Sequence, residues 1–70
     1  MASQWGVYVT CTAGKARRCA RVRKDRTGTD DACDCSGVSP CTVRISEEAA
    51  NDDAAAFNKA GCPAVVRPVP

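Results

Sequence analysis

The six cysteines of this 70-residue chain constrain its fold more than any other feature. A domain of this size buries only about 60% of its unfolded surface, so its core supplies roughly 3 to 5 kcal/mol of net stability. An even number of cysteines spread along so short a chain is typical of a disulfide framework. We therefore expect three disulfide bonds, whose pairing the sequence leaves open. The six residues are Cys11, Cys19, Cys33, Cys35, Cys41 and Cys62.

A structural metal ion is the main alternative explanation of the cysteines. A zinc ribbon carries paired Cys-x-x-Cys steps, whereas the closest pair here has one residue, Asp34, between two cysteines. Disulfide formation also implies an oxidising compartment, so we expect a secreted protein without a metal site or cofactor. The start of the chain has no apolar signal segment, so Met1 is either an addition to a mature form or the start of a cytosolic protein.

The absence of histidine argues against catalysis. Histidine is the commonest general base, and it activates the Ser or Cys nucleophile of many hydrolases. A redox enzyme is the remaining enzymatic alternative, because arginines around Cys19 favour a reactive thiolate. The missing Cys-x-x-Cys step argues against it. We therefore expect a protein that is not an enzyme.

Two segments alternate apolar and polar residues with the two-residue period of a half-buried strand. In residues 5–12, every second residue from Trp5 to Cys11 falls on one side, so Cys11 is placed to bridge to another element. Residues 41–46 follow the same pattern. No apolar run approaches the roughly 18 residues of a membrane span.

Two further strands are expected on weaker patterns. Residues 30–36 are a short strand, and the Gly and Pro of residues 36–40 predict a hairpin between it and the strand at 41–46. Residues 64–69 are a last strand, which Pro68 and Pro70 require to be short or at a sheet edge.

A helix is expected from residue 46 to residue 60. Ser46 can cap its start, two glutamates follow in the first turn, and the alanine-rich stretch has high helix propensity. Gly61 and Pro63 predict its end. The inward face consists of Ala50, Ala54 and Phe57.

Asp53 falls within this apolar arc. One interpretation is a carboxylate at the rim of the core, paired with an arginine such as Arg44 or Arg67. The other is a buried functional acid, for which nothing else in the sequence argues.

Residues 13–26 are compatible with two structures. Helical spacing of small residues and the good helix formers Lys and Arg favour a helix, whereas residues 19–23 also alternate like a strand. We expect the helix, which gives a single α+β domain over residues 1–70, a small disulfide-stapled ferredoxin-like split β-α-β sandwich with two helices on one face of an antiparallel sheet. The other choice gives an antiparallel sheet with one helix.

The charges are segregated along the chain. Residues 1–26 contain seven basic residues and one acidic residue, whereas residues 27–53 contain seven acidic residues and one arginine. If the two segments separate in space, the basic side can attract an anionic partner. The predicted contact residues are Lys15, Arg17, Arg18, Arg21, Arg23, Lys24 and Arg26.

Several of these features resemble a known family. Residues 5–14 close with Cys-Thr-Ala-Gly, a cysteine follows in the next expected helix, Cys41 opens a strand, and residues 57–62 run from Phe to Cys at the end of the second helix. This order resembles the killer protein six toxins of smut fungi and the secreted effectors of plant-pathogenic fungi that share their ferredoxin-like fold. The resemblance implies secretion, no enzymatic chemistry, and toxicity towards competing microbes or a role at a host surface.

The expected function is therefore that of a secreted, monomeric toxin or effector whose basic face contacts an anionic membrane, a cell wall, or a host or competitor protein. A disulfide-rigid protein-binding or inhibitor module is an alternative, which would present residues 27–31 or 36–40 to its partner. A basic nucleic-acid-binding module is another alternative, although Trp5, Tyr8 and Phe57 are the only side chains that could stack on bases.

Overall fold

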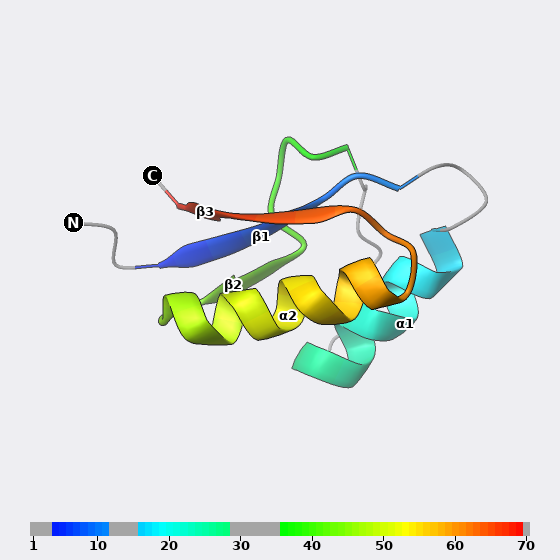
Figure 1. The fold of residues 1–70 in the computed structure, drawn as a ribbon, viewed down its shortest axis with the longest axis horizontal. Helices are drawn as coiled ribbons and strands as arrows, with labels where there is room; N and C mark the ends of the chain where they lie inside the picture. The colour runs from blue at the N-terminus through cyan, green and yellow to red at the C-terminus, as the bar shows by residue number, and fades with distance from the viewer. Residues whose placement is uncertain (1–3, 12–15, 29–35, 70) are drawn as a thin grey trace.

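A three-stranded antiparallel sheet and two helices form the domain, which is therefore α+β (Figure 1). The computed structural model describes residues 4–11, 16–28 and 36–69. No helix in these ranges is both long enough and apolar enough to cross a lipid bilayer. The elements are β1 (Trp5–Val9), α1 (Ala16–Thr27), β2 (Thr42–Arg44), α2 (Glu47–Lys59) and β3 (Ala64–Pro68).

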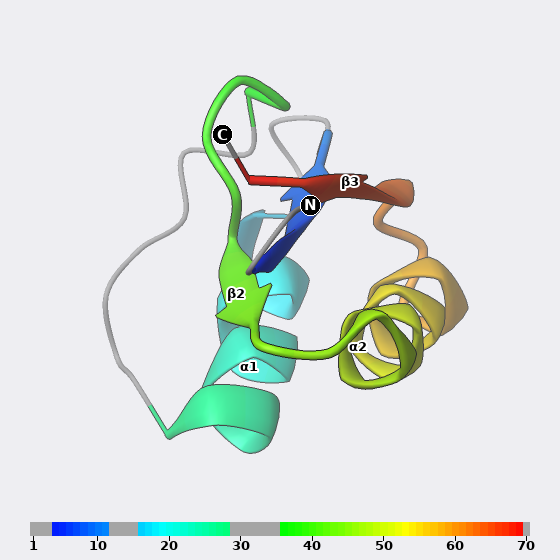
Figure 2. The same cartoon turned by 90° about the vertical axis from the view of Figure 1, so that its left-hand side faces the viewer.

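β1 is the central strand, with β2 and β3 on either side of it. Val7 lies opposite Thr42 of β2 and Val66 of β3, and Val9 lies opposite Ala64. Residues directly opposite one another share a face of the sheet, so these side chains point the same way. Figure 2 shows both helices on one side of the sheet, and the fully buried side chains of β1 pack there. The alternation that predicted β1 is confirmed at Val7 and Val9.

α2 contributes the largest fully buried side chain among the described residues. Ser46 caps the helix, because its hydroxyl accepts a hydrogen bond from the Ala49 N–H (3.1 Å). Phe57 is fully buried against Val7 and Val9 in one core cluster. The predicted capping residue is confirmed. The four buried residues of α2 follow helical spacing and are Ala50, Asp53, Ala54 and Phe57.

The segment of residues 13–26, which fitted both a helix and a strand in sequence, supplies most of the helix α1. Among the described side chains of α1, those of residues 17–27, Cys19 is the only buried one, and Val22 packs partly against the core. The helix ends where Gly28 takes a φ of 76° and donates its N–H to the Lys24 carbonyl (2.7 Å). α1 therefore attaches to the domain through few apolar contacts.

The strands are shorter than predicted, and the described sheet has three of the four expected. Residues 30–35 of the expected second strand lie outside the described residues, and Ser36 forms an isolated antiparallel bridge with Thr10. The predicted hairpin partner of β2 is therefore not seen; its described partner is β1. β2 ends at Arg44 because Ser46 leaves the sheet to cap α2.

A turn packs over β1 on the face of the sheet opposite the helices. The guanidinium of Arg67 lies 4.0 Å from the centroid of the Tyr8 ring and donates to the Gly37 carbonyl (3.0 Å). A Cβ at Gly6 would lie 3.0 Å from Pro40 Cβ and 2.9 Å from the Tyr8 ring. Glycine at position 6 therefore allows this close packing.

The packing of the core predicts a large loss of stability when one valine is changed to alanine and a small loss when another is. Val7→Ala removes two methyl groups from a side chain that is 0% exposed, and it should lower the free energy of unfolding by about 2 kcal/mol. Val65→Ala is the matched control, because Val65 is 56% exposed, and its effect should stay within about 0.5 kcal/mol. Urea denaturation measures both values, and equal losses would contradict the assigned faces of the sheet.

Candidate functional site

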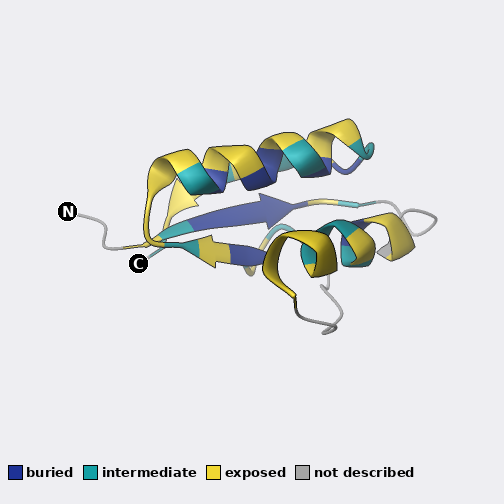
Figure 3. Ribbon diagram, turned by 90° about the horizontal axis from the view of Figure 1, so that it is seen from below, coloured by how far each residue is buried: buried dark blue, intermediate teal, exposed yellow. Residues whose placement is uncertain are grey.

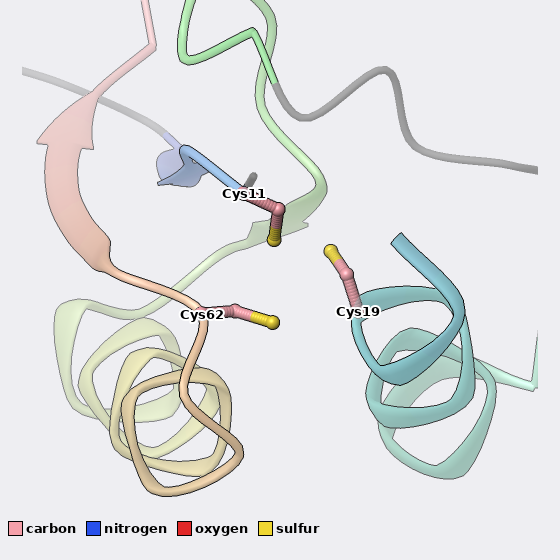
Figure 4. Close-up of side chains that lie close together, drawn as sticks. All are labelled: Cys11, Cys19 and Cys62. Atoms are coloured by element: carbon pink, nitrogen blue, oxygen red, sulfur yellow. The ribbon is translucent and has the colours of Figure 1, made fainter. Parts of the chain in front are cut away.

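Three cysteine side chains from separate parts of the chain meet beyond the C-terminal end of β1. Cys11 follows β1, Cys19 lies in α1, and Cys62 lies between α2 and β3. Their Sγ atoms all lie within 4.8 Å of one another, and Figure 4 shows the three side chains pointing toward a shared point. Cys19 and Cys62 are fully buried, and Cys11 is half-buried. We call these three residues the cysteine cluster.

Main-chain hydrogen bonds position the sheet side of this cluster. The Thr10 N–H donates to the Pro63 carbonyl (2.9 Å), which ties the end of β1 to the segment that leads into β3. The Cys62 N–H donates to the Phe57 carbonyl (2.9 Å) directly after Gly61, whose φ of 86° turns the chain away from α2. The backbone therefore holds two of the three cysteines close together, and α1 brings the third.

The cluster differs from the predicted disulfide framework. Its three cysteines are not disulfide-bonded. Cys41 is disulfide-bonded to none of these three, and its Sγ lies 3.9 Å from the Sγ of Cys19. Cys33 and Cys35 lie outside the described residues. Pairwise bonding is therefore not confirmed for the cluster, where three sulfurs, rather than two, converge at one place.

The predicted basic residues separate into different environments. Lys15 lies outside the described residues, Arg23 is half-buried, and Arg26 binds Asp53. The remaining four side chains are exposed, and Figure 3 shows exposed residues along α1. We call these four the basic face: Arg17, Arg18, Arg21 and Lys24.

Asp53 is buried beneath two arginines. Its carboxylate is 0% exposed and accepts hydrogen bonds from Arg26 Nε (2.8 Å), Arg44 Nε (2.6 Å) and Thr42 Oγ1 (3.0 Å). The predicted partner Arg44 is confirmed. The predicted rim position is wrong, because the two arginines and α1 cover the carboxylate. Arg67, the other suggested partner, lies over Tyr8 instead.

These contacts keep Asp53 charged. Burial opposes the charged form, but hydrogen bonds from Arg44, Arg26 and Thr42 outweigh burial, so the pKa of Asp53 is lowered from its ordinary value. The hydrogen bond to Asp53 raises the pKa of Arg44. Both carboxylate oxygens are occupied by donors from the protein itself. This arrangement fits a structural ion pair better than a functional acid.

Sequence reasoning missed the partner of Asp53 on α1 and the meeting of the three sulfurs. Arg26 lies 27 residues from Asp53, so no local pattern connects them. The alternation of β1 did place the Cys11 side chain toward the core, which was the available signal for one member of the cluster. The positions of the other two members, Cys19 and Cys62, depend on how α1 packs and on the connection between α2 and β3.

Comparison with known proteins found no matching family model, no similar curated protein and no similar solved structure.

The ion pair predicts how stability depends on pH. Because the pKa of Asp53 is lower in the folded state, its contribution is present above the unfolded carboxyl value of about 3.9 and is lost as pH falls through the folded value. Asp53→Asn should cost about 2 to 3 kcal/mol at neutral pH and should remove this acid-sensitive part of the stability.

Asp52→Asn is the matched control, because Asp52 is the exposed neighbour on the same helix and its loss should cost less than about 0.5 kcal/mol. Denaturant titrations between about pH 2 and pH 7 measure both variants. The buried ion pair would be refuted if Asp53→Asn and Asp52→Asn gave the same stability at every pH.

Proposed function

We propose that this protein is a non-enzymatic module that binds anionic surfaces, such as an anionic membrane or cell wall, through the basic face of α1. The observation that carries the proposal is the exposure of four cations on two adjacent turns of one helix. Residues 17, 21 and 24 recur with the spacing that places side chains on one side of a helix, and residue 18 lies beside them.

The acidic residues that the structure describes do not pair directly with the three arginines of this face. Arg17, Arg18 and Arg21 form no ion pair with any described residue. Asp53 pairs with Arg26 and Arg44, which are outside the basic face. The charge segregation of the sequence is therefore partly preserved in space, and it favours attraction of an anionic partner.

The expected affinity is modest and electrostatic. Each exposed Lys or Arg near an anionic membrane contributes roughly 1 kcal/mol. Four such residues support reversible adsorption, which salt weakens because it screens exposed charges. No large apolar side chain interrupts the four cations on α1, so the contact we propose is with the surface rather than with the membrane interior.

The distribution of aromatic residues favours such a surface over single-stranded nucleic acid. Trp5 and Tyr8 lie on β1, and Phe57 is fully buried. Proteins that bind single strands combine basic residues with aromatic side chains on which bases stack. The basic face has no aromatic residue.

A secreted toxin or effector, acting on competing microbes or at a host surface, is the setting we propose for this binding. The strand order β2-β1-β3 supports a ferredoxin-like arrangement in which residues 30–36 would supply a fourth strand at the edge of the sheet, beside β2. Disulfide stapling of the cysteines outside the cluster is part of the same proposal.

Protein binding through residues 36–40 is a second candidate. Arg67 and the Ser36 hydroxyl, which accepts from the Val38 N–H (3.2 Å), fix this turn, while the Val38 side chain is 81% exposed. A fixed turn with an exposed apolar side chain loses little entropy when it binds a partner.

Vesicle binding tests the main proposal. Arg21→Gln should weaken binding to vesicles of phosphatidylcholine and phosphatidylserine about fivefold, because one cation is lost from the contact. Lys59→Gln is the matched control: Lys59 is exposed at the end of α2, and the two variants have the same net charge. Lys59→Gln should bind within about twofold of the unchanged protein, because the lost charge lies outside the contact. Co-sedimentation at low salt measures the binding.

Equal weakening in Arg21→Gln and Lys59→Gln would show that net charge alone drives adsorption, which would contradict a defined basic face. Equal binding to vesicles of pure phosphatidylcholine would also contradict the proposal. Binding of duplex DNA without binding of either vesicle would favour the nucleic-acid alternative instead.

A further inference from the structure

We propose that the cysteine cluster is a thiolate site for one soft metal ion, with Zn²⁺ as the probe and Cys11, Cys19 and Cys62 as ligands. This inference goes beyond surface binding and does not rest on it. The observation is the convergence of three sulfurs from three segments within 4.8 Å of one another (Figure 4).

The distances between the three Sγ atoms are close to those between sulfur ligands of one metal ion. A Zn–S bond of about 2.3 Å places two ligands roughly 3.8 to 4.0 Å apart in tetrahedral or trigonal geometry. All three separations in the cluster lie within 4.8 Å, so shifts of about 1 Å or less would bring the sulfurs to these distances. A disulfide needs its two sulfurs at about 2.05 Å and would join only two members of the cluster, which leaves the third without a covalent role.

The ligand chemistry selects a soft ion. Thiolate sets bind Zn²⁺ or Cu⁺ in preference to Mg²⁺ or Ca²⁺, which require oxygen ligands. Three thiolates with Zn²⁺ carry a net charge of −1. Cys19 lies in the same helix as the four cations of the basic face, and it is the fourth residue from the positive end of that helix. Both features stabilise the negative charge of a metal–thiolate cluster.

Cys41 borders this site without belonging to it. Its Sγ lies 3.9 Å from Cys19 Sγ, but its disulfide bond removes it as a thiolate donor. Solvent or an added ligand would occupy the fourth position of a tetrahedral ion. The three-sulfur set therefore defines the site.

Metal binding would fasten α1 to the sheet. Cys19 is the only buried residue among the described side chains of α1, whereas the other two ligands flank the ends of β1 and α2. An ion held by all three would crosslink three segments of a domain with a small core. Because the unfolded chain does not hold the three sulfurs together, the ion would stabilise the folded state.

Titration of the metal-free protein with Co²⁺, without a thiol reductant so that the disulfide bond of Cys41 stays intact, tests the site. One Co²⁺ per chain should bind and produce thiolate-to-cobalt charge-transfer absorption, and one equivalent of Zn²⁺ should abolish that absorption. Zn²⁺ should also raise the midpoint of thermal unfolding. Cys19→Ser and Cys62→Ser should lose the absorption and the thermal shift, whereas Cys41→Ser, a buried cysteine outside the cluster, should keep both.

Cys11→His keeps the proposal testable if a serine variant does not fold. Imidazole is a good zinc ligand, so this variant should still bind one Co²⁺, with less charge-transfer absorption because one thiolate is gone. Circular dichroism of each metal-free variant shows whether it is folded.

Three results would overturn the site. They are the absence of charge-transfer absorption in the folded protein titrated without a reductant, its full retention in Cys19→Ser, and its loss in Cys41→Ser while Cys41→Ser stays folded. None of them changes the expected vesicle binding of the metal-free protein, so the two proposals fail independently.

Discussion

The attachment of α1 at both of its ends is the constraint on which the rest of the structure depends. Near the start of the helix, Cys19 enters the core beside the sulfurs of Cys11 and Cys62. Near its end, Arg26 binds the buried carboxylate of Asp53 on α2, and its carbonyl accepts a hydrogen bond from Arg44 (2.8 Å). A helix with so few buried apolar residues needs such polar and sulfur contacts, because hydrophobic burial alone would stabilise its position only weakly.

This mode of attachment leaves the outer side of α1 exposed. The contacts that position the helix use one cysteine and the arginine nearest its end, so the four cations of the basic face remain at the surface. The two partly exposed arginines compensate the charge of the Asp53 carboxylate, which would otherwise be buried without a partner. Different residues of α1 therefore serve the fold and the proposed function. Arg26 holds the helix in place, whereas Arg17, Arg18 and Arg21 are exposed and available to a partner.

The sequence predicted the features that depend on residues close together in the chain, and it missed the contacts between residues far apart in the chain. Alternation placed Val7 and Val9 in the core, and the cap at Ser46 and helical spacing placed Phe57 there. Residues 19–23 fit both a helix and a strand in pattern, the sequence favoured the helix, and the structure has a helix there with Cys19 packed in the core. The even number of cysteines suggested disulfide pairs. The cluster was missed because a number of cysteines carries no information on which sulfurs converge. The burial of Asp53 depended on an arginine from the other helix.

Alkylation of the cysteines tests the central claim most directly. The protein would be purified and denatured under nitrogen without a reducing agent, treated with iodoacetamide, and digested for mass spectrometry. The sulfur attachment of α1 predicts that Cys11, Cys19 and Cys62 all carry the alkyl group, because they are thiols in the folded protein. Recovery of Cys19 in a disulfide-linked peptide would contradict the account, since its sulfur would then be joined to a single partner and the three-sulfur meeting point would not exist.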